Sequence, residues 1–186
     1  MNKLLTFLLF SALVFFGCNQ ESEITSPVDS GSEHQLKLIE LPASSSGLSV
    51  ETQTYYKWIS GYNGGEFQQW YSYQSNAGTI SQFANLDFLP GAFSDWENIS
   101  MTFNTGGAAM ELGPQLQFQA VVEYTYIITG LDLSGVNPNT LDFVYIDANG
   151  NMYNVDYDYI TMDTSSGMLK VVNAILPHFS RYGFVN

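Results

Sequence analysis

The chain has 186 residues, of which 45% are hydrophobic, enough for one globular domain with a buried core. Eighteen acidic residues against five basic ones give a formal net charge of −13, which repels phosphate backbones and argues against nucleic acid as a partner. The single cysteine, Cys18, excludes an intramolecular disulfide. With two histidines besides, the composition argues against a zinc site, and no cofactor is predicted.

The N-terminus has the pattern of a lipoprotein export signal. One lysine precedes the apolar run Leu4–Phe16, which is too short for a transmembrane helix of roughly 20 apolar residues. Gly17 and Cys18 follow in the order of a lipobox, although two phenylalanines stand where that pattern has a leucine and a small residue. We predict a signal peptide over residues 1–17 and lipidation of Cys18, the alternative being an ordinary signal with an incidental cysteine.

The next segment, residues 18–35, is polar, acidic and rich in serine. It has too little apolar surface to order itself, which predicts a flexible tether behind the lipidated cysteine. Asn19 is not the aspartate that retains lipoproteins in the inner membrane of some diderm bacteria. We therefore expect a cell-envelope protein, anchored to the outer membrane, with an unknown protein or glycan as its further partner.

Residues 36–186 form the predicted folded domain, in which aromatic and β-branched segments alternate with turn signals and no 12-residue stretch has a helical period. These features predict an all-β fold, an antiparallel β-sandwich. Strands are expected over 36–41 (or an ordered arm), 55–60, 86–93, 99–103, 116–118, 121–129, 140–147, 151–155, 159–162, 168–172, 174–179 and 182–185.

Some of these strands carry more detailed expectations. Ile99, Met101 and Phe103 alternate onto one face, whereas the apolar run Tyr126–Ile128 predicts a strand packed on both faces. The Asn149–Gly150 pair can supply the positive φ of a tight hairpin turn, so residues 140–147 and 151–155 are expected to pair.

The order of several landmarks resembles that of ZU5 domains over residues 55–186. These landmarks are Gly64–Gly65, Leu89–Phe93, Ile99–Phe103, Glu111–Pro114 with Leu116 and Phe118, the Asn149–Gly150 hairpin and His178–Tyr182. Phe93 stands where leucine is usual, and the Gln-rich stretch 67–82 departs from the family pattern. Most ZU5 domains are interaction or spacer modules. The resemblance therefore implies a divergent ZU5-like sandwich in a bacterial lipoprotein, serving as a non-enzymatic interaction, adhesion or scaffold module.

In some eukaryotic ZU5-type domains, a His-Phe-Ser triplet cleaves its own chain. The resemblance places this chemistry on His178 and Ser180: Ser180 Oγ would attack the carbonyl of Phe179, His178 would act as the base, and water would hydrolyse the ester. In an extended strand, the side chains of residues 178 and 180 would share a face. We favour the alternative, in which Phe179 fills the core and its two neighbours face solvent, so we expect no enzymatic activity.

A second candidate site is a cluster of seven tyrosines and tryptophans. It comprises Tyr55, Tyr56, Trp58, Tyr62, Trp70, Tyr71 and Tyr73. Exposed rings on a sandwich can stack on sugars, which makes Trp58, Trp70 and Tyr71 candidates for a glycan-binding face. Rings that alternate along strands are more often core residues and cross-strand pairs, and this is the interpretation we favour.

A third pattern is the alternation of Asp147, Asn149 and Asn151 around Gly150. It places oxygen ligands as in a calcium loop, but the bidentate glutamate of that loop is missing. We predict a hairpin turn there and no metal site.

Overall fold

The computed structural model describes residues 36–47 and 50–186. The signal peptide, the Cys18 anchor and the tether predicted within residues 1–35 lie outside the described residues. The described part of the domain contains eleven strands and no helix, so it has no helix that could span a membrane.

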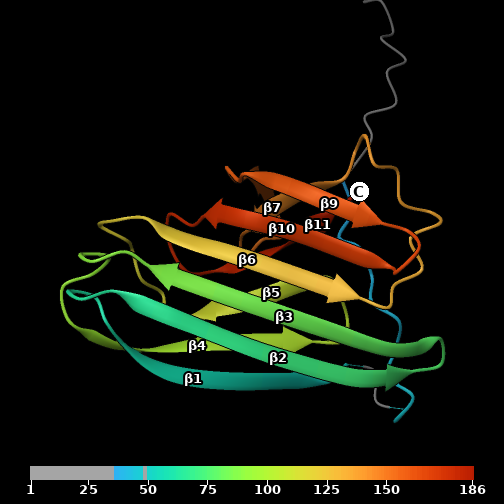
Figure 1. Ribbon diagram of the computed structural model, residues 1–186, viewed down its shortest axis with the longest axis horizontal. Helices are drawn as coiled ribbons and strands as arrows, with labels where there is room; N and C mark the ends of the chain where they lie inside the picture. The colour runs from blue at the N-terminus through green and yellow to red at the C-terminus, as the bar shows by residue number, and fades with distance from the viewer. Residues whose placement is uncertain (1–35, 48–49) are drawn as a thin grey trace, which may run out of the picture. The chain divides into compact units, whose positions relative to one another are not determined.

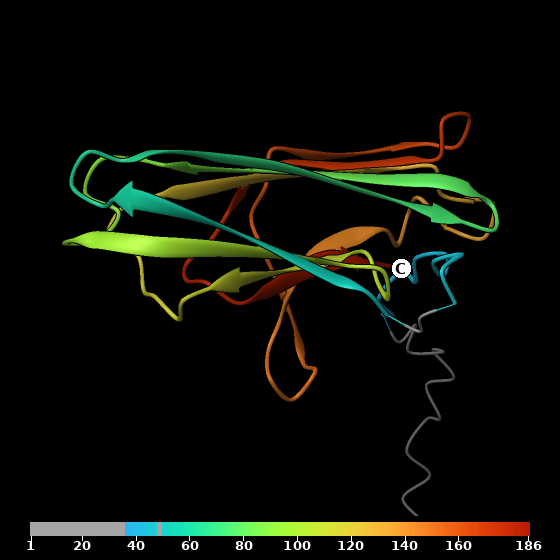
Figure 2. The ribbon, with the colours of Figure 1, turned by 90° about the horizontal axis from the view of Figure 1, so that it is seen from below.

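The domain is an antiparallel β-sandwich, as predicted, with two sheets packed face to face (Figures 1 and 2). The six-stranded sheet has, in spatial order, β1 (Thr52–Ser60), β4 (Trp96–Asn104), β5 (Ala109–Gly113), β11 (Arg181–Val185), β7 (Asp142–Ile146) and β8 (Met152–Asn154). The five-stranded sheet has β2 (Gly65–Ser75), β3 (Gly78–Phe88), β6 (Val122–Thr129), β10 (Met168–Ile175) and β9 (Tyr159–Asp163).

Alternating apolar residues explain how the strands form a sandwich. In β4, the side chains of Ile99, Met101 and Phe103 are fully buried between the sheets, as predicted. β6 alternates in the same way, with Tyr126 and Ile128 buried and Ile127 only half-buried on the outer face. The prediction that this strand packs on both faces was wrong, because no further layer of the described residues covers the five-stranded sheet (Figure 2).

The core between the sheets is rich in aromatic rings and holds one buried polar network. The ring of Tyr126 lies 5.8 Å from that of Phe184 in the opposite sheet. The Tyr126 hydroxyl donates to Gln82 Oε1, and Gln82 Nε2 donates to the Asn104 carbonyl at 3.0 Å. Burial raises the pKa of the Tyr126 phenol well above its usual range, so the group stays a donor at all physiological pH values.

Two predicted strand boundaries were wrong. The segment 86–93 was expected to be one strand, but β3 ends at Phe88 and the chain turns through Gly91, whose φ is 89°. The preceding Gln-rich stretch, which had no predicted strand, forms the hairpin of β2 and β3.

The turn after β3 also contacts the connection between β1 and β2. Gly61 packs so closely against this turn that a Cβ would lie 2.1 Å from the Phe93 carbonyl oxygen, which explains the glycine-rich connection between β1 and β2.

The C-terminal strands also differ from the prediction. β10 continues to Ile175 through a β-bulge, at which Asn173 adopts a φ of 52°. The segments 116–118 and 174–179 were expected to be strands, but beyond Ile175 they meet only in a single bridge between Gln117 and His178. The predicted hairpins β7–β8 and β9–β10 both form.

The segment 36–41 is an ordered arm, one of the two alternatives predicted for it. Leu38 bridges Val185, and Ile39 N donates to the Phe184 carbonyl at 3.0 Å. Leu36 and Leu38 pack on a small outer cluster that contains Val144 and Val185. The arm thereby covers the outer face of the six-stranded sheet near β11, and no segment that the structure describes covers the β1–β4 part of that face.

Candidate functional site

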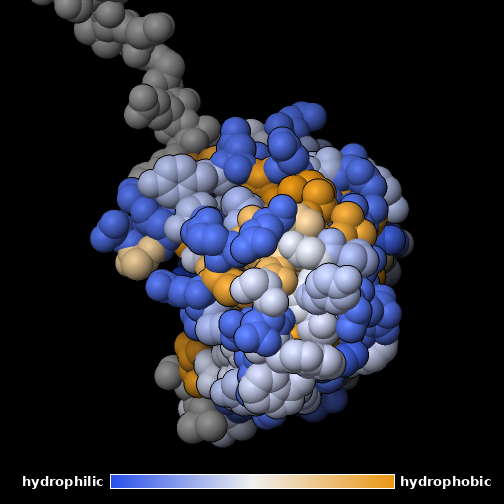
Figure 3. Space-filling view, turned by 90° about the vertical axis from the view of Figure 1, so that its left-hand side faces the viewer, coloured by the Kyte–Doolittle hydropathy of each residue, from blue (hydrophilic) through white to orange (hydrophobic). Residues whose placement is uncertain are grey.

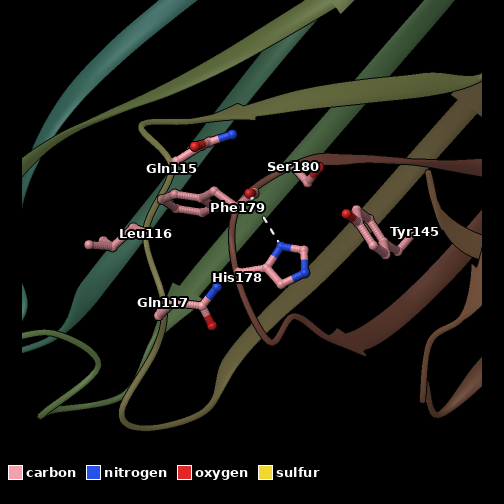
Figure 4. A pocket seen from close by; sticks show the side chains of 7 residues that line it. All are labelled: Gln115, Leu116, Gln117, Tyr145, His178, Phe179 and Ser180. Atoms are coloured by element: carbon pink, nitrogen blue, oxygen red, sulfur yellow. Dashed lines mark hydrogen bonds between the residues drawn. The ribbon is translucent and has the colours of Figure 1, made fainter. Parts of the chain in front are cut away.

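The His-Phe-Ser triplet lies in the bend between β10 and β11, at one end of the sandwich. It lines a surface pocket of about 410 Å³, whose other lining residues are Gln115, Leu116, Gln117 and Tyr145 (Figure 4). Figure 3 views this end of the molecule and shows apolar patches between hydrophilic side chains. The exposed Leu89 and Val121 lie side by side there, joined by a 3.2 Å backbone bond.

The His178 imidazole is held next to the carbonyl that self-cleavage would attack. Its Nδ1 lies 3.3 Å from the Phe179 carbonyl oxygen (Figure 4), and its ring packs edge-on against Tyr145 at 4.7 Å. The backbone carbonyl of His178 accepts a 2.6 Å bond from the Tyr182 hydroxyl. The ring therefore faces the carbonyl oxygen, and in the described residues no hydrogen bond joins it to Ser180 Oγ.

The peptide between Phe179 and Ser180 is anchored on both sides. Phe179 N donates to the Leu116 carbonyl at 3.1 Å, and Leu112 N donates to the Ser180 carbonyl at 2.9 Å. The Phe179 side chain is 2% exposed and packs edge-on against Phe118 at 4.8 Å. This burial agrees with the favoured interpretation of the triplet.

The expected strand geometry of the triplet was wrong, because residues 178–180 form a bridge and a bend. The favoured interpretation also expects His178 and Ser180 to face solvent. Both side chains are instead half-buried. General-base catalysis needs the base within hydrogen-bond reach of the nucleophile. An N–H at His178 Nδ1 can donate to the Phe179 carbonyl oxygen, but the arrangement does not activate Ser180.

The aromatic cluster predicted as core is divided between three environments. Tyr71 points inward and packs against Tyr73 and Phe103. Trp70 is 62% exposed on the outer face of the five-stranded sheet, where its ring lies 4.7 Å from Phe83. Trp58 is 63% exposed on the outer face of the other sheet. Neither tryptophan is a core residue, although Trp70 forms a cross-strand pair with Phe83, as the favoured interpretation allowed. The three glycan-site candidates cannot form one site.

Tyr56, Trp58 and Trp96 share the open outer face of β1 and β4, and we call these three residues the aromatic strip. Their exposed fractions are 66%, 63% and 60%. Trp58 pairs with Asn98 across the strands, so Trp96 is its diagonal neighbour, about 7–8 Å away between Cα atoms. Tyr56 follows about 7 Å along β1. Among the described residues, none of the three rings contacts another aromatic ring.

Uncharged polar side chains flank the strip. Asn98 and Ser100 lie opposite Trp58 and Tyr56, and Thr54 and Thr102 share a 2.9 Å hydroxyl contact at the next register position. The outward positions of β1 and β4 therefore carry rings, amides and hydroxyls and no carboxylate. On the neighbouring strand β5, the exposed Glu111 lies opposite Thr102 and brings a carboxylate to the edge of this uncharged region.

Trp96 was missed as a site residue in the sequence. The signal was available, because Ile99, Met101 and Phe103 were predicted to face inward, which places the even-numbered positions of that strand outward. What the sequence lacked was the pairing of this strand with the one that contains Trp58, a contact between residues about 40 positions apart.

The Asp147 loop is a hairpin turn, as predicted. Asp147 Oδ1 accepts 2.8 Å bonds from the backbone N–H groups of Asn149 and Asn151, and Asn151 Nδ2 donates to Oδ2 at 2.8 Å. These bonds, led by the Asn151 side chain, lower the pKa of the carboxyl group. Both oxygens are thereby used within the turn, and no group of three metal-ligating side chains is found in the described residues.

Comparisons with protein-family models, with curated proteins and with solved structures found no match to this chain.

Proposed function

We propose that the chain is a lipid-anchored cell-envelope protein whose β-sandwich is a non-enzymatic binding module. The N-terminal leader and the position of Cys18 support a location in the cell envelope, and Asn19 supports anchoring in the outer membrane. The observation that carries the binding role is the aromatic strip. Single exposed apolar residues are ordinary, whereas three neighbouring rings that no part of the described domain covers indicate a contact surface.

The ligand class that best fits the strip is a neutral glycan. A sugar ring presents an apolar face and a rim of hydroxyl groups, which match an exposed indole and flanking amide and hydroxyl groups. Asn98 offers both donors and acceptors next to Trp58. A negatively charged polymer fits less well, because the acidic chain would repel it.

Retention of the full chain, in detergent, by gels that contain soluble neutral polysaccharides tests this role. We expect Trp58→Ala and Trp96→Ala each to weaken retention about tenfold, which corresponds to about 1.4 kcal/mol. Tyr159→Ala is the matched control, because Tyr159 is 49% exposed on the other sheet. If no polysaccharide retains the chain, or if the three variants behave alike, the strip does not bind neutral glycans.

Self-processing between Phe179 and Ser180 is the second candidate, favoured by the 3.3 Å contact between His178 and the Phe179 carbonyl oxygen. This reaction requires Ser180 Oγ to turn toward the carbonyl carbon of Phe179 and the His178 imidazole to turn toward Ser180 Oγ. The intact mass of the full chain under denaturing conditions separates the two candidates. A loss of Ser180–Asn186 that Ser180→Ala abolishes would establish processing, and one undivided mass would eliminate it.

A further inference from the structure

The two lateral sides of the sandwich end in edge strands of very different length. On one side β1 and β2 have nine and eleven residues, and on the other β8 and β9 have three and five. Figure 1 shows the two long edges along the same side of the domain. Short edge strands limit pairing with another chain, whereas a long, regular edge presents a row of unpaired backbone groups.

The outward backbone groups of β2 are occupied at its two ends. The Glu66 carbonyl accepts a bond from Lys57 Nζ, and the Gln74 carbonyl accepts a 2.8 Å bond from Ser45 N. Both carbonyls therefore point away from β3. The register of β2 with β3 is regular from Gly65 to Ser75, without a bulge.

Because the backbone direction alternates along a regular strand, the residues between these ends also point their N–H and carbonyl groups outward at every second position. These residues are Gln68, Trp70 and Ser72. No backbone bond joins their outward groups to another segment of the described domain. The open stretch is thus five residues long, and Trp70 is its centre.

We propose that β2 pairs antiparallel with β2 of a second copy of this chain, about a two-fold axis at Trp70. The axis places Trp70 opposite its own equivalent and Gln68 opposite Ser72 of the other copy. Each pair consists of two outward-facing residues, so each can exchange two backbone hydrogen bonds. The stretch is self-complementary because its open groups are distributed symmetrically about its centre.

The charge and the exposure of the side chains on β2 are compatible with a second copy of the chain at this edge. The open stretch has no charged side chain, and in the paired register Glu66 faces Gln74 of the other copy and not a second glutamate. Two strongly acidic chains can therefore approach here with little local repulsion. Pairing also covers the exposed flank of Trp70, whose ring already packs on Phe83. The neighbouring edge strand β1 has a charged side chain, Lys57, near its middle, which disfavours pairing of β1 with another chain.

Pairing would also bring two aromatic strips to one side of the dimer. An axis perpendicular to the sheet leaves the outer face of the six-stranded sheet pointing the same way in both copies. Two weak sites on one polymer then bind with avidity. This consequence rests on the proposed function, whereas the pairing itself does not.

Cysteine cross-linking in membranes from cells that make the full chain tests the register. Co-expressed Gln68→Cys and Ser72→Cys chains should form a disulfide, since paired Cα atoms lie about 5.5 Å apart. Either variant alone should not exceed the baseline, because its two cysteines are about 13 Å apart along the strands. The unsubstituted chain, with Cys18 alone, sets that baseline. No cross-link in the mixture, or equal cross-linking in the single variants, would overturn the proposed register.

Sedimentation of the full chain in density-matched detergent tests the association without a cysteine. We expect twice the monomer mass, reduced to the monomer mass in Trp70→Lys, which places two ammonium groups opposite each other. Trp58→Lys is the matched control, because Trp58 is equally exposed on the other sheet, and it should remain a dimer. A monomeric wild type, or a dimer in both variants, contradicts the pairing. A monomer that still binds polysaccharide leaves the proposed function intact.

Discussion

The inward and outward rings of β1 contrast sharply although they are sequence neighbours. Tyr55 points between the sheets, where its ring meets Phe103 edge-on at 5.9 Å. Tyr56, one residue later, is 66% exposed and has no ring partner in the described domain. The residue type is the same, so its environment is decided by the two-residue period of the strand. The inner rings pack the two sheets together, and the outer rings are exposed on the surface of the described domain.

Truncation of one inner and one outer ring should produce the largest difference. Phe103→Ala removes a fully buried ring that contacts Tyr55 and Tyr71, and we expect a loss of about 3–5 kcal/mol in the free energy of unfolding. Trp58→Ala should change it by less than about 1 kcal/mol, because its ring is already in solvent. Urea denaturation of the two variants measures both values, and similar losses would contradict the contrast.

The buried polar network should give the next effect. Gln82→Leu leaves the Asn104 carbonyl and the Tyr126 hydroxyl without their partner, and we expect it to cost about 1–3 kcal/mol of unfolding free energy. Gln74→Leu, at an exposed position of β2, is the control and should be nearly neutral. A loss for Gln82→Leu no greater than that for Gln74→Leu would show that the network contributes nothing.

The architecture was more predictable than the site. Strand period and turn chemistry predicted the sandwich, the β7–β8 and β9–β10 hairpins and the inward face of β4. The Gln-rich stretch that forms β2 was missed because polar residues occupy its outward positions and its aromatic residues fall on both faces. The assembly of the aromatic strip depends on the pairing of β1 with β4, and no local pattern encodes such a pairing.

The smallest expected effect concerns an outer charge, Asp163, which is the last residue of β9 before the turn to β10. Bonds from the Ser165 and Ser166 side chains lower its pKa from 3.8 to about 2. A depressed pKa in the folded state stabilises the fold above the unfolded value and loses this contribution as the pH falls through the folded one. The difference in Tm between wild type and Asp163→Ala should therefore be present above about pH 4 and vanish near pH 2. A difference that stays constant over this range would contradict the assignment.

The proposal that the aromatic strip binds neutral glycans is tested most directly by the tryptophan fluorescence of the full-length Trp70→Phe variant. Trp58 and Trp96 are then its only indoles, and both belong to the aromatic strip. Titration with short neutral oligosaccharides should change the emission in a saturable way, with a signal that Tyr56→Ala weakens. A saturable change in wild type that disappears in Trp70→Phe would move the site to the opposite sheet, and no change in either protein would contradict glycan binding by the strip.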